Sequence, residues 1–74
     1  MLKMDLEPAK VEICQFLKGR ERATLAEIRS GVKTRHPLIF VLALSELERE
    51  GAVLNMEGGT FWAINSPFAD RYLQ

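Results

Sequence analysis

Residues 44–53 read LSELEREGAV, and the interpretation of this stretch decides the fold of the chain. Leu44 and Leu47 are three residues apart, so both lie on one side of a helix and can pack inward. Gly51 allows the left-handed backbone conformation that commonly ends a helix. Val53 then begins a short β-like run. The stretch therefore predicts the end of a helix followed directly by a strand.

Two β-like runs follow one another, AVLNM at 52–56 and TFWAI at 60–64, and a Gly-Gly pair lies between them. Glycine reaches the positive φ angles that tight hairpin turns require, so the pattern predicts a β-hairpin. Alternate side chains of a strand point to opposite faces. We therefore expect one of Phe61 and Trp62 to pack against the helices and the other to face outward.

A first helix is expected to begin at Asp5 or Glu7 with Pro8, because proline is tolerated in the first turn, and to end at Gly19. Its apolar face is formed by Val11, Cys14 and Leu17, flanked by Ile13 and Phe16. A free cysteine on an inward helix face behaves as a small hydrophobic residue.

A second, shorter helix is predicted to begin after Thr24. The sequence TLAE allows a capping box, in which Thr24 and Glu27 each satisfy a free backbone N–H group. Leu25 and Ile28 are expected to face inward, and Gly31 to stop the helix.

A third helix is predicted from Pro37, which suits a first helical position, to about Glu50. At the C-terminus, SPFADRYL predicts a short helix with Ser66 as its N-cap and Pro67 at its first position. Residues 66–74 are thus expected to form a short helix or tail.

The predicted order of elements is helix, short helix, turn, longer helix and two-stranded hairpin. This order resembles the winged helix-turn-helix fold over residues 7–65. The L-x-x-L-x-x-x-G-x-V pattern, followed by a hairpin ending in an aromatic residue, is similar to the close of many small prokaryotic winged-helix regulators. The resemblance implies one domain over residues 1–74, of the α+β class and mostly α. It also implies DNA binding, with the third helix in the major groove and the hairpin as the wing.

The third helix carries two apolar faces. A helical wheel places one set of residues inward, namely Phe40, Ala43, Leu44 and Leu47. The opposite set is Leu38, Val41, Leu42, Ser45 and Arg49. Leucine and valine cannot donate hydrogen bonds to base edges, so direct readout by the first half of this helix is limited to thymine methyl groups.

Three explanations of Leu38, Val41 and Leu42 stay open at this point. The first is pairing with a second copy or another protein. The second is cover by the chain's own termini, with candidate residues Met1, Leu2, Met4, Leu6, Phe68, Tyr72 and Leu73. The third is contact with DNA methyl groups. Candidate protein-interface residues are Leu38, Val41, Leu42, Phe68, Tyr72 and Leu73.

Positive charge gathers in residues 18–36, the basic segment, which holds six Lys and Arg against two Glu for a net charge of +4. Residues 1–17 carry −1 and residues 37–74 carry −3, so the whole chain is neutral. We expect phosphate contacts from this segment, with Arg35 also reaching a base at the groove edge, whereas Glu57 in the hairpin turn repels phosphate. The candidate DNA-binding residues are Lys18, Arg20, Arg22, Arg29, Lys33, Arg35 and His36.

No catalytic, metal, cofactor or small-molecule site is predicted. His36 has no second metal ligand at a useful spacing and is interpreted as an N-cap or turn residue. No nucleophile–base pair is visible, and a domain of this size offers little room for a closed pocket.

The composition, 47% hydrophobic and 27% charged, is typical of a globular protein. The longest apolar run is far shorter than the roughly 20 residues that span a bilayer, and a single cysteine cannot build a disulfide framework. We expect a cytoplasmic protein that is not an enzyme.

Two functional hypotheses follow. The first is a DNA-binding transcriptional regulator that acts as a dimer and makes mostly backbone contacts. The second is a protein-interaction module in which the third helix mediates homodimerisation or partner binding instead of DNA readout.

Overall fold

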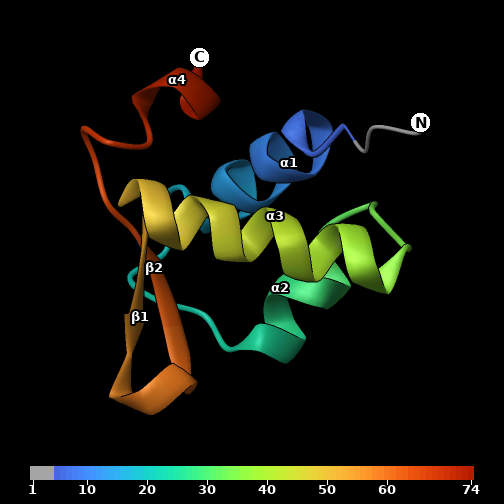
Figure 1. The fold of residues 1–74 in the computed structure, drawn as a ribbon. Coiled ribbons are helices and arrows are strands. Elements are labelled where there is room, and N and C mark those ends of the chain that lie inside the picture. The colour runs from blue at the N-terminus through green and yellow to red at the C-terminus, as the bar shows by residue number, and fades with distance from the viewer. Residues whose placement is uncertain (1–4) are drawn as a thin grey trace.

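The computed structural model describes residues 5–74 and contains the elements expected from the sequence, in the expected order (Figure 1). The helices are α1 (Glu7–Leu17), α2 (Leu25–Gly31), α3 (Pro37–Glu50) and α4 (Asp70–Leu73). The strands are β1 (Val53–Met56) and β2 (Phe61–Ile64), joined by the 3-10 turn η1 (Glu57–Gly59). The class is therefore α+β, and the layout is consistent with a winged-helix-like arrangement.

The hairpin, called the wing below, pairs β1 and β2 antiparallel, with Val53 opposite Ile64 and Met56 opposite Phe61. Both turn glycines have positive φ, 66° for Gly58 and 96° for Gly59. The two glycines therefore adopt the positive φ angles on which the prediction of this turn was based.

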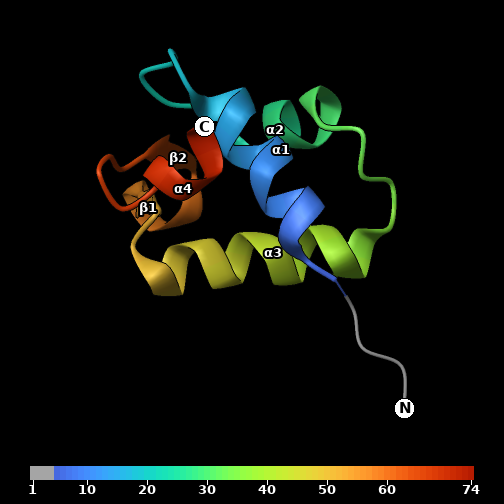
Figure 2. The same ribbon diagram turned by 90° about the horizontal axis from the view of Figure 1, so that it is seen from above.

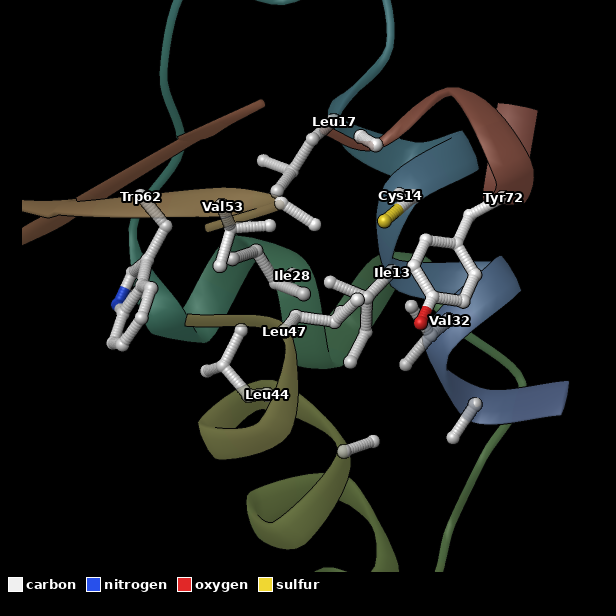
Figure 3. Close-up of a cluster of buried hydrophobic side chains, with 14 of the residues drawn as sticks. Ile13, Cys14, Leu17, Ile28, Val32, Leu44, Leu47, Val53, Trp62 and Tyr72 are labelled. Atoms are coloured by element: carbon white, nitrogen blue, oxygen red, sulfur yellow. The ribbon is translucent and has the colours of Figure 1, made fainter. Parts of the chain in front are cut away.

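The two aromatic side chains of β2 differ in burial, as expected from strand alternation. Trp62 is buried with 8% of its surface exposed, whereas Phe61 is half-buried. The indole ring of Trp62 packs beside Leu44 and Val53 (Figure 3), so it attaches the returning strand to the helical core.

A backbone bridge from the α1–α2 connection to the wing was not predicted. Ala23 donates to the Trp62 carbonyl at 2.9 Å, and Trp62 donates to the Ala23 carbonyl at 2.8 Å. β2 therefore lies between residue 23 and β1. A bridge of one residue has no periodicity, which is why sequence patterns did not reveal it.

The capping box of α2 is confirmed. Thr24 Oγ1 accepts from the Glu27 N–H at 3.2 Å, and Glu27 Oε1 accepts from the Thr24 N–H at 2.8 Å. The inward position predicted for Leu25 is wrong, because its side chain is 42% exposed while that of Ile28 is buried. Helical side chains lean toward the helix N-terminus, so a residue at the first position projects past the end of the helix.

The core is one cluster shared by the helices and the wing (Figure 3). The inward face predicted for α3 is confirmed, since Phe40, Ala43, Leu44 and Leu47 are all buried. Gly51 ends this helix in the left-handed conformation with φ 85°. Cys14 is completely buried between α1 and its neighbours, as its position on the apolar face suggested.

The C-terminal helix begins later than predicted. α4 starts at Asp70, and Ser66 is not its N-cap. Residues 66–69 instead form a turn in which the Ala69 N–H donates to the Asn65 carbonyl at 3.2 Å and the Asp70 N–H to the Pro67 carbonyl at 3.0 Å. α4 then packs against α1 (Figure 2), where Gln15 Nε2 donates to the Tyr72 carbonyl at 3.1 Å.

Gly31 lies where no larger residue fits. A Cβ atom at this position would lie 2.0 Å from Phe16 Cε1, and the Phe16 ring is covered by the Arg20 guanidinium, 4.1 Å from the ring centre. We expect Gly31→Ala to lower the free energy of unfolding by about 1–3 kcal/mol, because the ring must move to relieve the overlap. Urea unfolding followed by circular dichroism measures this change. Ser30→Ala, one residue earlier on the exposed surface, is the control and should change stability by less than about 0.5 kcal/mol. Equal stability of the two variants would contradict the steric argument.

Candidate nucleic-acid interface

All seven candidate DNA-binding side chains are exposed, but they do not form one patch. Lys18, Arg20 and Arg22 precede the bridging residue Ala23, whereas Lys33 and Arg35 lie in the turn before α3. These two connections lie at opposite ends of the helical layer (Figures 1 and 2). The basic segment therefore extends across the molecule.

The wing brings one cation and one anion together. Arg22 Nη1 lies 2.9 Å from Glu57 Oε2, and the guanidinium stacks 4.0 Å from the centre of the Phe61 ring. Both charged side chains are substantially exposed, so the ion pair contributes little stability. Its electrostatic effect is that Arg22 offsets the wing carboxylate that was expected to repel phosphate.

Two further arginines of the basic segment lie over aromatic rings. Arg20 stacks on Phe16 and donates through Nε to the Phe16 carbonyl at 3.0 Å. Arg29 of α2 lies 5.3 Å from the ring centre of Phe40 on α3. Stacking restricts the guanidinium while its edge keeps hydrogen-bond donors for an oxygen ligand.

The basic segment differs from the rest of the chain in how its charges are paired. Within residues 5–74, each cation outside the segment has a carboxylate partner: Lys10 pairs with Glu46 and Glu50, Arg49 with Glu46, and Arg71 with Glu7. Among the six Lys and Arg of the segment, only Arg22 has a carboxylate partner within the same residues. The cations that have no carboxylate partner within residues 5–74 therefore lie where phosphate contacts were predicted.

The outward face of α3 is apolar and exposed. Leu38 and Val41 are each 50% exposed and Leu42 is 36% exposed; these three residues are called the α3 apolar face below. Ser45 and Arg49 continue the same side toward the C-terminus of the helix and are also exposed.

The C-terminal segment does not cover this face. Tyr72 is 1% exposed and belongs to the core, and Leu73 is half-buried against it. Phe68 is 63% exposed and lies beside Gly51, at the opposite end of α3 from Leu38. Leu6 packs against the core cluster. The other proposed covering residues, Met1, Leu2 and Met4, lie outside the described residues.

A charged cluster at the junction of α1, α3 and α4 was not predicted. Lys10 is 7% exposed, and its Nζ lies 2.6 Å from Glu50 Oε2 and 3.3 Å from Glu46 Oε1. The Tyr72 hydroxyl donates to the other oxygen of Glu50. One sequence signal exists: Lys10 precedes Ile13, Cys14 and Leu17 at helical spacing, so it lies on the inward face of α1.

This cluster shifts the pKa values of its members. Burial by itself lowers the pKa of Lys10, but its hydrogen bond to Glu50 and the neighbouring negative charge outweigh burial and leave it raised. Burial by itself raises the pKa of Glu50, but the hydrogen bonds from Lys10 and Tyr72 leave it lowered. Burial raises the pKa of Cys14 to about 12, with a smaller effect from Glu50, so this thiol is not activated.

Glu12 of α1 holds the turn between α2 and α3. Its Oε1 accepts from the Lys33 N–H at 3.1 Å, the Thr34 N–H at 2.9 Å and the Thr34 hydroxyl at 2.8 Å. The Thr34 hydroxyl contributes most to a lowered pKa of Glu12. This carboxylate therefore determines where the basic turn lies relative to α1.

We expect Glu12→Ala to lower the free energy of unfolding by roughly 1–3 kcal/mol, because two backbone N–H groups lose their acceptor. The pKa of Glu12 is lower in the folded chain than its ordinary value of 4.5, so its contribution is complete above pH 4.5 and is lost as the pH falls through the lowered pKa. Urea unfolding at pH 7 and at acid pH should show a smaller acid loss for Glu12→Gln than for the unmodified chain. Glu21→Gln, an exposed substitution in the α1–α2 connection, is the control. An acid loss unchanged by Glu12→Gln would contradict the assignment.

Within the described part of the chain, no group of three or more His, Cys, Asp and Glu side chains is arranged to hold a metal ion. His36 occupies the N-cap position of α3, but its side chain makes no capping hydrogen bond. Residues 5–74 contain no helix with the length and apolarity needed to cross a membrane.

Comparison of the chain with protein-family models, with curated proteins and with solved structures gave no match. The functional argument therefore rests on the residues of this chain and their arrangement.

Proposed function

We propose that this chain is a small winged helix-turn-helix protein that binds duplex DNA, acts as a dimer and regulates transcription. The observation that carries the proposal is the uneven pairing of charge. The basic segment holds cations without carboxylate partners within residues 5–74, whereas Lys10, Arg49 and Arg71 are all paired. Cations that are not locally compensated attract phosphate and release its counterions on binding.

The mode of binding follows from what the surface lacks. The α3 apolar face has no side-chain hydrogen-bond donors, and the charge of Arg22 is offset by Glu57 on the wing. Base edges are read by hydrogen-bonding side chains, so direct readout through α3 is small. The proposed contacts are with the phosphate backbone, through Lys18, Arg20, Arg29, Lys33 and Arg35.

A second candidate function is a protein-interaction module that does not bind DNA. The specific observation in its favour is the exposure of Leu38, Val41 and Leu42 on the helix that would otherwise face the major groove. Exposed apolar surface on a soluble domain commonly marks an interaction site.

Binding of a labelled duplex of mixed sequence, followed by fluorescence anisotropy at two salt concentrations, separates the two candidates. Each phosphate contact contributes a slope of about −0.9 to log affinity against log salt, so the five proposed contacts predict a loss of roughly five-hundredfold between about 50 and about 200 mM salt. Lys18→Gln and Arg29→Gln should each weaken binding and reduce the slope by about 0.9.

Arg71→Gln is the matched control, because it removes the same charge from a side chain that already pairs with Glu7 at 3.2 Å. It should leave the salt dependence unchanged. Absence of binding at the lower salt concentration would overturn the DNA proposal and favour the interaction module. Equal weakening by Arg71→Gln and Arg29→Gln would show that only net charge matters and would overturn the assigned contacts.

A further inference from the structure

The outward side of α3 has the spacing of a helix-pairing seam. Leu38, Leu42, Ser45 and Arg49 follow one another at intervals of four, three and four residues, and Val41 flanks them. This alternation is the one that keeps side chains facing a partner helix in coiled-coil packing. All five side chains are exposed, so the seam is unoccupied by any residue from 5 to 74.

The two ends of the seam carry opposite charge. Lys33 and Arg35 lie just before α3, and neither has a carboxylate partner within residues 5–74. The last five residues of α3 hold three glutamates against Arg49, and Lys10 of α1 pairs with two of them, Glu46 and Glu50, so this end carries a net charge of −1. Glu48 has no cationic partner within residues 5–74. A surface that is positive at one end, apolar in the middle and negative at the other matches its own copy only when the copies run antiparallel.

We infer that the α3 apolar face binds a second copy of this chain, with the two α3 helices antiparallel about a two-fold axis. The axis passes between Val41 and Leu42, so Val41 of each copy lies opposite Leu42 of the other at the centre of the pair. A rise of about 1.5 Å per residue then brings Arg35 of one copy beside Glu48 of the other. The same register brings Leu38 of one copy over Ser45 of the other.

The surface of α3 is shaped for this register. A shallow hollow on the helix is lined, among the described residues, by Leu42, Ser45, Glu46 and Arg49. Residues i, i+3, i+4 and i+7 of a helix form the hole that receives one side chain of a partner helix. The register that pairs Arg35 with Glu48 of the other copy places Leu38 of the second copy at this hollow.

This inference names the dimer partner and rests only on the dimeric part of the proposed function. It engages Arg35, one of the proposed phosphate contacts, and leaves Lys18, Arg20 and Arg29 outside the helix pair and available to DNA. The seam has five side chains, against the roughly 20–30 residues per partner of a standard interface, so the dimer should be weak and depend on concentration.

Sedimentation equilibrium of the purified chain over a range of concentrations is the first test. The apparent mass should rise from 8.4 kDa toward twice that value. Leu38→Asp combined with Leu42→Asp should keep the helical circular dichroism signal and remain at the monomer mass. Leu54→Asp is the control, because Leu54 is 45% exposed on the wing, and it should associate like the unmodified chain.

Charge reversal tests the register without touching an apolar residue. Arg35→Glu and Glu48→Arg should each weaken the dimer between about threefold and thirtyfold, since two symmetric exposed pairs are lost. The double variant, Arg35→Glu with Glu48→Arg, should restore association. Arg35 lies before the first residue of α3 and Glu48 in its last turn, and the helix from Pro37 to Glu48 alone is about 17 Å long, so the rescue cannot arise within one chain.

A chain that stays monomeric at every concentration would overturn the inference, as would a dimer that survives both aspartate substitutions or fails to recover in the double charge reversal. Dimerisation without DNA binding would leave the inference standing and overturn the DNA proposal. DNA binding by a chain that stays monomeric would overturn this inference and leave the DNA-binding part of the proposed function standing.

Discussion

Replacement of Tyr72 by alanine is expected to lower the free energy of unfolding by about 3–5 kcal/mol, the usual cost of removing a large buried aromatic side chain. Only 1% of Tyr72 is exposed, and its ring lies against α1 in the core (Figure 3). A domain of this length has a total stability of about 4–11 kcal/mol, so the variant should be close to unfolded at room temperature.

Two matched variants separate the parts of this effect. Tyr72→Phe keeps the ring and removes only the hydroxyl that donates to Glu50, so it should cost about 1.5–3 kcal/mol. Phe68→Ala changes an aromatic residue of the same segment that is 63% exposed, and it should cost less than about 0.5 kcal/mol. Urea unfolding followed by circular dichroism measures all three. If Tyr72→Ala were as stable as Phe68→Ala, the segment after the wing would not belong to the core.

Replacement of Lys10 by alanine is the second substitution with a large expected effect. It removes the cation that faces Glu46 and Glu50 and leaves a gap beside Cys14. Breaking a fully buried ion pair costs about 3–5 kcal/mol. The two carboxylates are 34% and 33% exposed, so water replaces part of the lost interaction and we expect about 2–3 kcal/mol.

Lys10→Met retains the aliphatic stem and should cost less than Lys10→Ala, which separates packing from charge. A double-mutant cycle of Lys10→Met with Glu50→Gln should give a favourable coupling energy of at least about 0.5 kcal/mol, as expected for residues in direct contact. Arg71→Met with Glu7→Gln is the control cycle, because that ion pair is exposed, and its coupling should be smaller. Additive effects in the first cycle would contradict the contact.

The same cluster sets the pH range of full stability. The lowered pKa of Glu50 means that its contribution is complete above the ordinary value of 4.5 and is lost as the pH falls. The raised pKa of Lys10 means that its contribution is complete below the ordinary value of 10.5 and is lost as the pH rises through the raised value. The unfolding midpoint of Lys10→Met should therefore depend less on pH at both extremes than that of the unmodified chain.

Local patterns were sufficient for the elements themselves. Thr24 and Glu27 predicted the start of α2, Gly51 predicted the end of α3, and the Gly-Gly pair predicted the turn of the wing. Each of these signals acts between residues a few positions apart, through a backbone hydrogen bond or an allowed φ angle. Local patterns were less reliable at the ends of elements. They predicted an inward Leu25, which is exposed, and they predicted that α4 begins at Pro67, three residues before its observed start.

The sequence by itself determined the element order, the inward face of α3 and the apolar character of its outward face, because helical periodicity alone separates the two faces. Only the tertiary structure decided which distant residues meet. Lys10 contacts Glu46 and Glu50 across 36 and 40 residues, Glu12 holds Thr34 across 22, and Ala23 pairs with Trp62. These contacts depend on how the helices cross and on where the wing returns, which spacing along one helix does not encode. The same reason explains why a basic segment that is continuous in sequence is divided between opposite ends of the molecule.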